Sequence, residues 1–214
     1  METQIQYNSL NGKEIQIHYP DHIHGTKLLH YTTYDIPAGT TLAFMAHWHP
    51  EYKIVWQLDG FTEFRVDGDL YHINAGEAMF LNGNCVHGHA SPSIHYGHYL
   101  CFSFGEEFLF PDCNSHIYNR FFMPFQSGQY TFTKLITNRS AYEREILSIL
   151  NDLAALSKNI SDNALSIQIC LLRIFETMFR ENAFSPCNRK IAKQELIKTA
   201  LWYINQNYTA SVSI

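Results

Sequence analysis

Three histidines are the residues of this sequence whose type and spacing could do chemistry. His47 and His49 flank a tryptophan, and alternate side chains of a strand point to the same face, so both imidazoles would project together. His87 follows about forty residues later, a separation at which two strands of a small barrel can face each other across its interior. Three converging imidazoles could bind zinc, iron, manganese or copper, and a carboxylate normally completes such a set.

Short runs of β-forming residues surround these histidines. Asp-Gly, Ala-Gly and Asn-Gly pairs divide the runs at spacings of about eight residues, which is typical of a sandwich or barrel. The sequence therefore predicts an all-β barrel that extends to about Pro111. The expected strands are TTLAFMA (40–46), KIVWQLD (53–59), FTEFRV (61–66), LYHI (70–73), EAMFLN (77–82) and HYGHYLCFSF (95–104).

The pattern becomes helical after residue 138. Apolar residues at three- and four-residue steps predict a helix over 140–159, with a capping box of Ser140 and Glu143 at its start. A second helix, at about 163–181, has two apolar stripes, which implies two partners. These are the barrel and the neighbouring helix or, for one stripe, a second copy of the protein. The stripes are Ile167, Leu171, Ile174 and Met178, and Leu165, Leu172 and Phe179.

The C-terminal part of the chain predicts a separate unit. The segment FSPCNR (184–189) combines proline with polar residues and is expected to be a short linker. A third amphipathic helix is expected over 190–208. The predicted division is therefore a barrel domain at 1–138, a helical pair at 139–184, and a linker with one further helix at 185–214.

Composition excludes several classes of protein. The chain has 214 residues, of which 46% are hydrophobic and 16% charged, so it can bury a core and is not a disordered tail. No apolar run of about 18 residues and no secretory signal is present. The net charge of −5 argues against nonspecific wrapping of nucleic acid. The five cysteines form no C-x-x-C pair, which predicts reduced thiols and a cytoplasmic location.

Two segments resemble the motifs of cupin barrels. The first runs from His47-Trp48-His49 through Lys53 to Gly60, and the second from Gly76 through NGN (82–84) to His87. Residues 40–104 therefore look like a cupin, also called a double-stranded β-helix, followed by α-helices. This barrel, the FSF strand end, two helices and ALWYINQNYTASVSI (200–214) together resemble the AraC/XylS family of transcriptional regulators over nearly the whole chain.

The resemblance implies a ligand-sensing and dimerisation portion of a regulator rather than an enzyme. In that family the cupin binds a small effector, two helices mediate homodimerisation, and a pair of helix-turn-helix units reads DNA. Here the helices would be those at 140–181, and 200–214 would begin the DNA-binding part. Both recognition helices are missing, so we expect the chain to be a fragment and only the full-length protein to bind operator DNA.

The departures from the cupin motifs argue against a metal. Lys53 stands where the first motif has a metal-binding glutamate, and its ammonium would repel a divalent cation. Glu51 could replace that ligand only if the strand bulged. Asn82 and Asn84 stand where the second motif has proline and glycine. We therefore expect no cofactor, and no metal. If one were bound, the ligands would be His47, His49 and His87.

The histidines are accordingly expected to form the polar lining of an effector pocket. Imidazoles and tyrosines suit the hydroxyl groups of a sugar or sugar-derived metabolite, whereas Lys53 could pair with an anionic one. The alternative is a metal-dependent cupin enzyme, a dioxygenase or sugar isomerase, that uses the three histidines. Strand alternation puts Trp48 and Trp56 on the opposite face. The predicted ligand-binding residues are His47, His49, Lys53, His87, His89, His98 and Tyr99.

Overall fold

A computed structural model describes most of the barrel and the helical pair. It covers residues 5–10, 13–18, 29–39, 46–90, 96–112, 115–132, 135–187, 199–200 and 203. The strand expected over 40–46, the third helix and the start of the DNA-binding part lie almost wholly outside the described residues. Among the described helices, none is long and apolar enough to cross a membrane.

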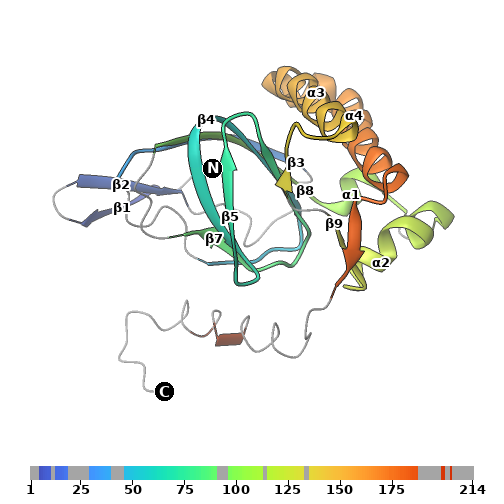
Figure 1. The fold of residues 1–214 in the computed structure, drawn as a ribbon, viewed down its shortest axis with the longest axis horizontal. Coiled ribbons are helices and arrows are strands. Elements are labelled where there is room, and N and C mark those ends of the chain that lie inside the picture. The colour runs from blue at the N-terminus through green and yellow to red at the C-terminus, as the bar shows by residue number, and fades with distance from the viewer. Residues whose placement is uncertain are drawn as a thin grey trace.

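An antiparallel sheet of seven strands curls into a barrel, and the expected β barrel followed by α-helices is confirmed (Figure 1). Its main path has the order β10-β6-β4-β8-β3, while β5 and β7 pair with β4. A separate hairpin consists of β1 (Ile5–Leu10) and β2 (Lys13–His18). The barrel strands are β3 (Leu29–Ile36), β4 (Tyr52–Val66), β5 (Asp69–Asn74), β6 (Ala78–Leu81), β7 (His87–His89), β8 (Gly97–Phe104) and β10 (Leu135–Ile136).

Strand β4 is continuous through Asp59-Gly60, so the prediction of two strands and a turn there is wrong. The register with β8 shifts between Gln57 and Asp59, which marks a bulge that bends the strand. Gly60 has φ +68°, and a Cβ there would lie 2.1 Å from the Tyr96 carbonyl oxygen. Before the bulge β4 pairs with β6 and β8; beyond it the pairing with β8 continues only to Gly60, and β5 and β7 take over from Phe61 and Phe64. A single strand thereby closes the barrel.

The first half of β4 is buried on both faces, because the barrel interior covers one face and the helices cover the other. Val55 points into the barrel and packs with Met79 and Tyr99. Ile54 and Trp56 belong to the cluster on the outer face, against the helices, where Trp56 was expected. The outer face is thus apolar, whereas the inner face holds the buried polar residues Lys53 and Gln57 beside Val55.

Two helices form the layer over that outer face (Figure 1). They are α3 (Ala141–Leu156) and α4 (Ile160–Arg180), joined by a short 3-10 turn, η3 (Ser157–Asn159). Helix α4 begins three residues earlier than predicted because Asn159 caps it. The apolar stripe of α4 that runs from Ile167 to Met178 is buried. The second stripe is buried only in part. Leu165 is 69% exposed, whereas Leu172 and Phe179 are half-buried against the core.

The capping box at the start of α3 is confirmed. The Ser140 hydroxyl accepts from the Glu143 amide at 3.3 Å, and the Glu143 carboxylate accepts from the Ser140 amide at 2.8 Å. The same carboxylate accepts two hydrogen bonds from Thr137. Burial alone would raise the pKa of Glu143, but these hydrogen bonds outweigh it and the pKa is lowered. The carboxylate therefore stays charged and ties the barrel to the helix.

The segment expected to be a linker begins with a strand. Phe184–Pro186 forms β11, which pairs with β9 (Tyr130–Phe132). The prediction failed because Phe184 has aromatic neighbours in Phe125 and Phe179, which hold the segment on the protein. The remaining elements are α1 (Glu106–Leu109), η2 (Tyr118–Phe122) and α2 (Met123–Gln126).

Replacing Ser140 by alanine should lower the free energy of unfolding by about 1 kcal/mol, because the Glu143 amide loses its side-chain acceptor and the Glu143 carboxylate loses the hydrogen bond from the Ser140 hydroxyl. Urea denaturation followed by circular dichroism measures the change. Ser148→Ala, at an exposed position in the same helix, is the control and should cost nothing. Equal stabilities of the two variants would contradict the role assigned to the cap.

A polar cavity inside the barrel

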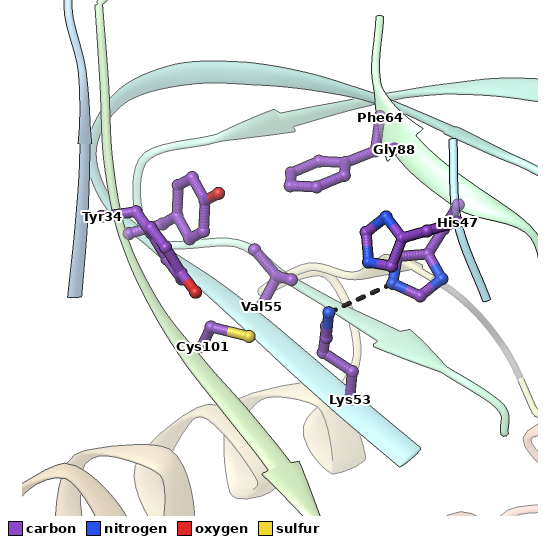
Figure 2. Close-up of a pocket in the computed structure, with 9 residues that line it drawn as sticks. Tyr34, His47, Lys53, Val55, Phe64, Gly88 and Cys101 are labelled. Carbon is purple, nitrogen blue, oxygen red and sulfur yellow. Dashed lines mark hydrogen bonds between the residues drawn. The ribbon is translucent and has the colours of Figure 1, made fainter. Parts of the chain in front are cut away.

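The barrel encloses a small cavity on the concave side of β4 and β8 (Figure 2). Its volume is about 20 Å³, which is room for about one water-sized group. A sugar ring is several times larger, so a sugar could enter only if lining side chains moved. The lining consists of Tyr34, His47, Lys53, Val55, Phe64, His87, Gly88, Tyr99 and Cys101.

Backbone pairing brings the histidines of the two motifs together. The His47 amide donates to the His87 carbonyl at 2.9 Å, and the His87 amide donates back to the His47 carbonyl at 2.9 Å. Next to this bridge the Asn84 amide donates to the His49 carbonyl. Asn84 has φ +63°, a left-handed conformation that asparagine tolerates better than most residues. Asparagine can therefore serve where the cupin motif has glycine.

The three imidazoles converge as their spacing predicted. The ring of His87 lies 4.4 Å from that of His47 and 4.8 Å from that of His49, measured between centroids. One ring nitrogen from each residue falls within 4.8 Å of the others. On distances alone, such a group could hold a metal ion.

The ammonium of Lys53 takes the nitrogen that a metal would need. Lys53 Nζ donates to His87 Nε2 at 3.1 Å (Figure 2). On the other side of the ring, His87 Nδ1 donates to the Cys85 carbonyl at 3.0 Å. With Nδ1 carrying the proton, Nε2 holds the only free lone pair of the ring, and that lone pair accepts from Lys53.

Glu51 does not supply the missing carboxylate. Its Oε2 lies 3.2 Å from His49 Nδ1, and it is not a member of the cluster of possible ligand atoms. The bulge that could have turned it toward the cluster is absent, because β4 pairs regularly from Tyr52 to Gln57 and shifts register only beyond. Three imidazoles alone can bind zinc, but here the Lys53 ammonium occupies the His87 lone pair and would repel a divalent cation.

The other ionisable groups of the site are held neutral by burial. Burial lowers the pKa of His87 well below its usual value, and Lys53 lowers it further. Burial also lowers the pKa of His49, despite the opposing effect of Glu51, and lowers that of His89 to about 3. On the opposite wall, burial raises the pKa of Tyr99 and of Cys101. At neutral pH the imidazoles of His49, His87 and His89 are thus uncharged, and so are the Tyr99 phenol and the Cys101 thiol.

Two predicted residues, His89 and Tyr99, meet inside the barrel. His89 Nε2 and the Tyr99 hydroxyl share a hydrogen bond of 3.0 Å, and both side chains contact the Phe64 ring edge-on. Tyr99 lines the cavity, while His89 is buried beside it. Their polar groups therefore form a second layer next to the histidine cluster.

His98 does not line the cavity, which corrects its inclusion among the ligand-binding residues. Because side chains alternate along β8, Tyr99 and Cys101 point inward and His98 points away. His98 Nδ1 instead lies 2.6 Å from a carboxylate oxygen of Asp35, which is 66% exposed. This pair belongs to the protein surface.

Sequence reasoning missed the wall opposite the histidines. Tyr34 lies on β3, a strand that the turn pattern did not reveal, and Cys101 gave no chemical signal. Val55 was visible, since it follows Lys53 by two residues and shares its inward face. Phe64 could not be assigned, because the unpredicted bulge in β4 changes which side chains face inward.

Comparison with known proteins gives one family match. The profile described as "AraC-like ligand binding domain" matches residues 38–172. No curated protein sequence matches the chain.

Several solved structures are similar in part. A cupin protein from Bacteroides fragilis is 20% identical, with a TM-score of 0.33, over 37% of this chain and 68% of that one. An RmlC-like cupin from Shewanella frigidimarina is 19% identical, with a TM-score of 0.32, over 47% and 83%. A Streptococcus pyogenes protein of unknown function is 17% identical, with a TM-score of 0.34, over 38% and 68%.

The buried histidines should make the protein less stable in mild acid. His89 has a pKa of about 3 in the folded state against a usual value of 6.5, so between these pH values only the unfolded chain binds the proton. Each such histidine adds a slope of up to about 1.4 kcal/mol per pH unit, and stability falls as the pH drops below 6.5. Urea denaturation between pH 7.5 and 5 should show a shallower slope for His89→Gln, and an unchanged slope would contradict this assignment.

Proposed function

This chain belongs to the family of AraC-like ligand binding domains, and from that premise we propose that it senses a small effector for a transcriptional regulator. The observation that carries the proposal is the cavity inside the barrel. There a lysine, neutral imidazoles and phenols are fixed in place by hydrogen bonds, within walls that are otherwise apolar. A few oriented polar groups in an apolar shell are what a small-molecule site requires.

The effector is a sugar or another small polar metabolite. The Tyr34 hydroxyl, the His47 imidazole and the Lys53 ammonium, all in the lining, can each donate to a ligand oxygen. Because the cavity holds only a water-sized group, the effector must displace side chains when it enters. Such rearrangement gives the occupied and empty barrels different shapes, and a ligand that prefers one shape shifts the population toward it.

The regulator forms a homodimer through the helical pair at 140–181. Helix α4 buries one stripe against the barrel but leaves Leu165 and Ile169 exposed, at 69% and 49%. Because they are four residues apart, they share one face of the helix. An apolar face that the described residues do not cover is suited to the same face of a second copy, related by a two-fold axis.

DNA binding belongs to the C-terminal part of the complete regulator. Residues 200–214 resemble the start of a helix-turn-helix domain, and nearly all of them lie outside the described residues. Operator DNA would be bound by the recognition helices of that domain. A protein that binds operator DNA works in the cytoplasm.

A metal-dependent cupin enzyme is the second candidate. The observation that favours it is the convergence of His47, His49 and His87. Against it stands Lys53, which donates to the His87 lone pair. Stoichiometric zinc, iron, manganese or copper in the purified protein, measured by elemental analysis, would support the enzyme over the sensor.

A thermal-shift screen of sugars and sugar acids tests effector binding. At least one compound should raise the melting temperature of the wild-type chain. Val55→Ile adds a methyl group to the cavity wall and should abolish that shift whatever the charge of the ligand, because it fills the space. Val66→Ile, in the same core but away from the lining, is the control and should keep the shift. A full shift in Val55→Ile would contradict the cavity as the site.

Introducing a charged residue on the exposed face of α4 tests the proposed dimer. Leu165→Glu should convert a dimer to a monomer in sedimentation velocity, since pairing would bury a carboxylate. Leu70→Glu is the matched control, because Leu70 is 42% exposed on β5 at the far side of the barrel, and it should stay dimeric. A wild-type chain that is monomeric at high concentration would refute the dimer.

A further inference from the structure

Lys53 is the one formal charge in the cavity lining. Its side chain is only 7% exposed and projects from β4 toward the imidazoles of the opposite wall (Figure 2). The other lining residues are aromatic, aliphatic, histidine, cysteine and glycine, and none is acidic. The cavity therefore carries a positive charge that its own walls do not balance.

The rest of the described chain does not balance this charge either. Among the described residues, no carboxylate forms an ion pair with Lys53, and their ion pairs all join other side chains. Glu51, the nearest acid along the chain, lies against His49 instead. The recorded hydrogen-bond partner of the ammonium is the imidazole of His87. A buried ammonium that meets only a neutral partner is costly to fold.

We propose that the effector carries one carboxylate group and that this group binds the Lys53 ammonium inside the barrel. The inference rests on the proposed function and narrows its ligand to an acid, such as a sugar acid. The carboxylate accepts from Lys53 Nζ, which has three donors and gives only one to His87. The Tyr34 hydroxyl, on the wall facing Lys53 in Figure 2, is placed to donate as well. The ligand thus supplies the counter-charge that the described residues do not provide.

Other ions match this site less well. A phosphate monoester carries nearly two negative charges at neutral pH, whereas the lining has one lysine and no arginine. A divalent cation would need the His87 lone pair that Lys53 occupies, and the two positive charges would repel each other. A carboxylate has the one charge and the acceptor oxygens that a single ammonium satisfies.

Matched ligand pairs isolate the carboxylate. Isothermal titration of the full chain would use D-galacturonate against D-galactose and D-glucuronate against D-glucose, which differ only in a carboxylate or a hydroxymethyl group. Acetate, inorganic phosphate and zinc chloride are separate arms. We expect one acid to bind at least tenfold more tightly than its neutral partner. A neutral sugar that binds as tightly as its acid, or phosphate or zinc that binds more tightly than every acid, would overturn the proposal.

Lysine variants test the contact itself. Lys53→Met keeps most of the length of the side chain without its charge and should weaken binding of the acid at least tenfold. Lys53→Arg keeps the charge and should retain part of the affinity for the acid. Lys158→Met, at an exposed position in η3, is the matched control and should bind like the wild type. Undiminished binding of the acid by Lys53→Met would contradict the proposal.

Unliganded stability gives an independent measurement. If the ammonium awaits an anion, Lys53→Met should melt at the same temperature as the wild type or a few degrees higher, because a costly buried charge is gone. A melting temperature several degrees lower would mean that Lys53 is a structural partner of His87 and would overturn the proposal. If neutral sugars bind and Lys53→Met has no effect, only this inference fails. If no sugar or acid binds, the proposed sensor function fails with it.

Discussion

The burial of β4 on both faces is the constraint on which the rest of this structure depends. Its outer face needs α3 and α4 as a cover, and its inner face, with Val55, forms the wall of the cavity. The bulge at Asp59 then lets the same strand leave one side of the barrel and close the other. Because one strand contacts both the site and the helices, a shift of its inner side chains has a direct path to the outer layer.

The second governing interaction is the hydrogen bond from Lys53 to His87. This hydrogen bond and the one from His87 Nδ1 to the Cys85 carbonyl fix the tautomer of His87. The Lys53 ammonium lies where the cupin motif has a glutamate. The histidine cluster is thereby changed from a possible metal site into a set of neutral groups around a charge.

The helical layer shows how a local cap and tertiary contacts work together. Glu143 accepts from Ser140 within the helix and from Thr137 of the segment after β10. Ring contacts among Phe125, Phe132 and Phe179 then hold β9 and α2 against α4. This packing leaves Leu165 and Ile169 at the other side of α4 without cover from the described chain.

The sequence by itself determined the local features. Residue alternation predicted that His47 and His49 project together, and the capping box predicted where α3 begins, because both features depend on residues close in the sequence. The spacing of the two cupin-like motifs predicted that His87 would lie beside His47 and His49. Tertiary structure alone decided that Asp59-Gly60 is a bulge, that Phe184 lies in a strand, and that His98 faces outward. Each of these three features depends on which strand is the neighbour in the sheet, and that neighbour is distant in the sequence. That no acidic residue lines the cavity beside Lys53 likewise became visible only when the lining residues were in place.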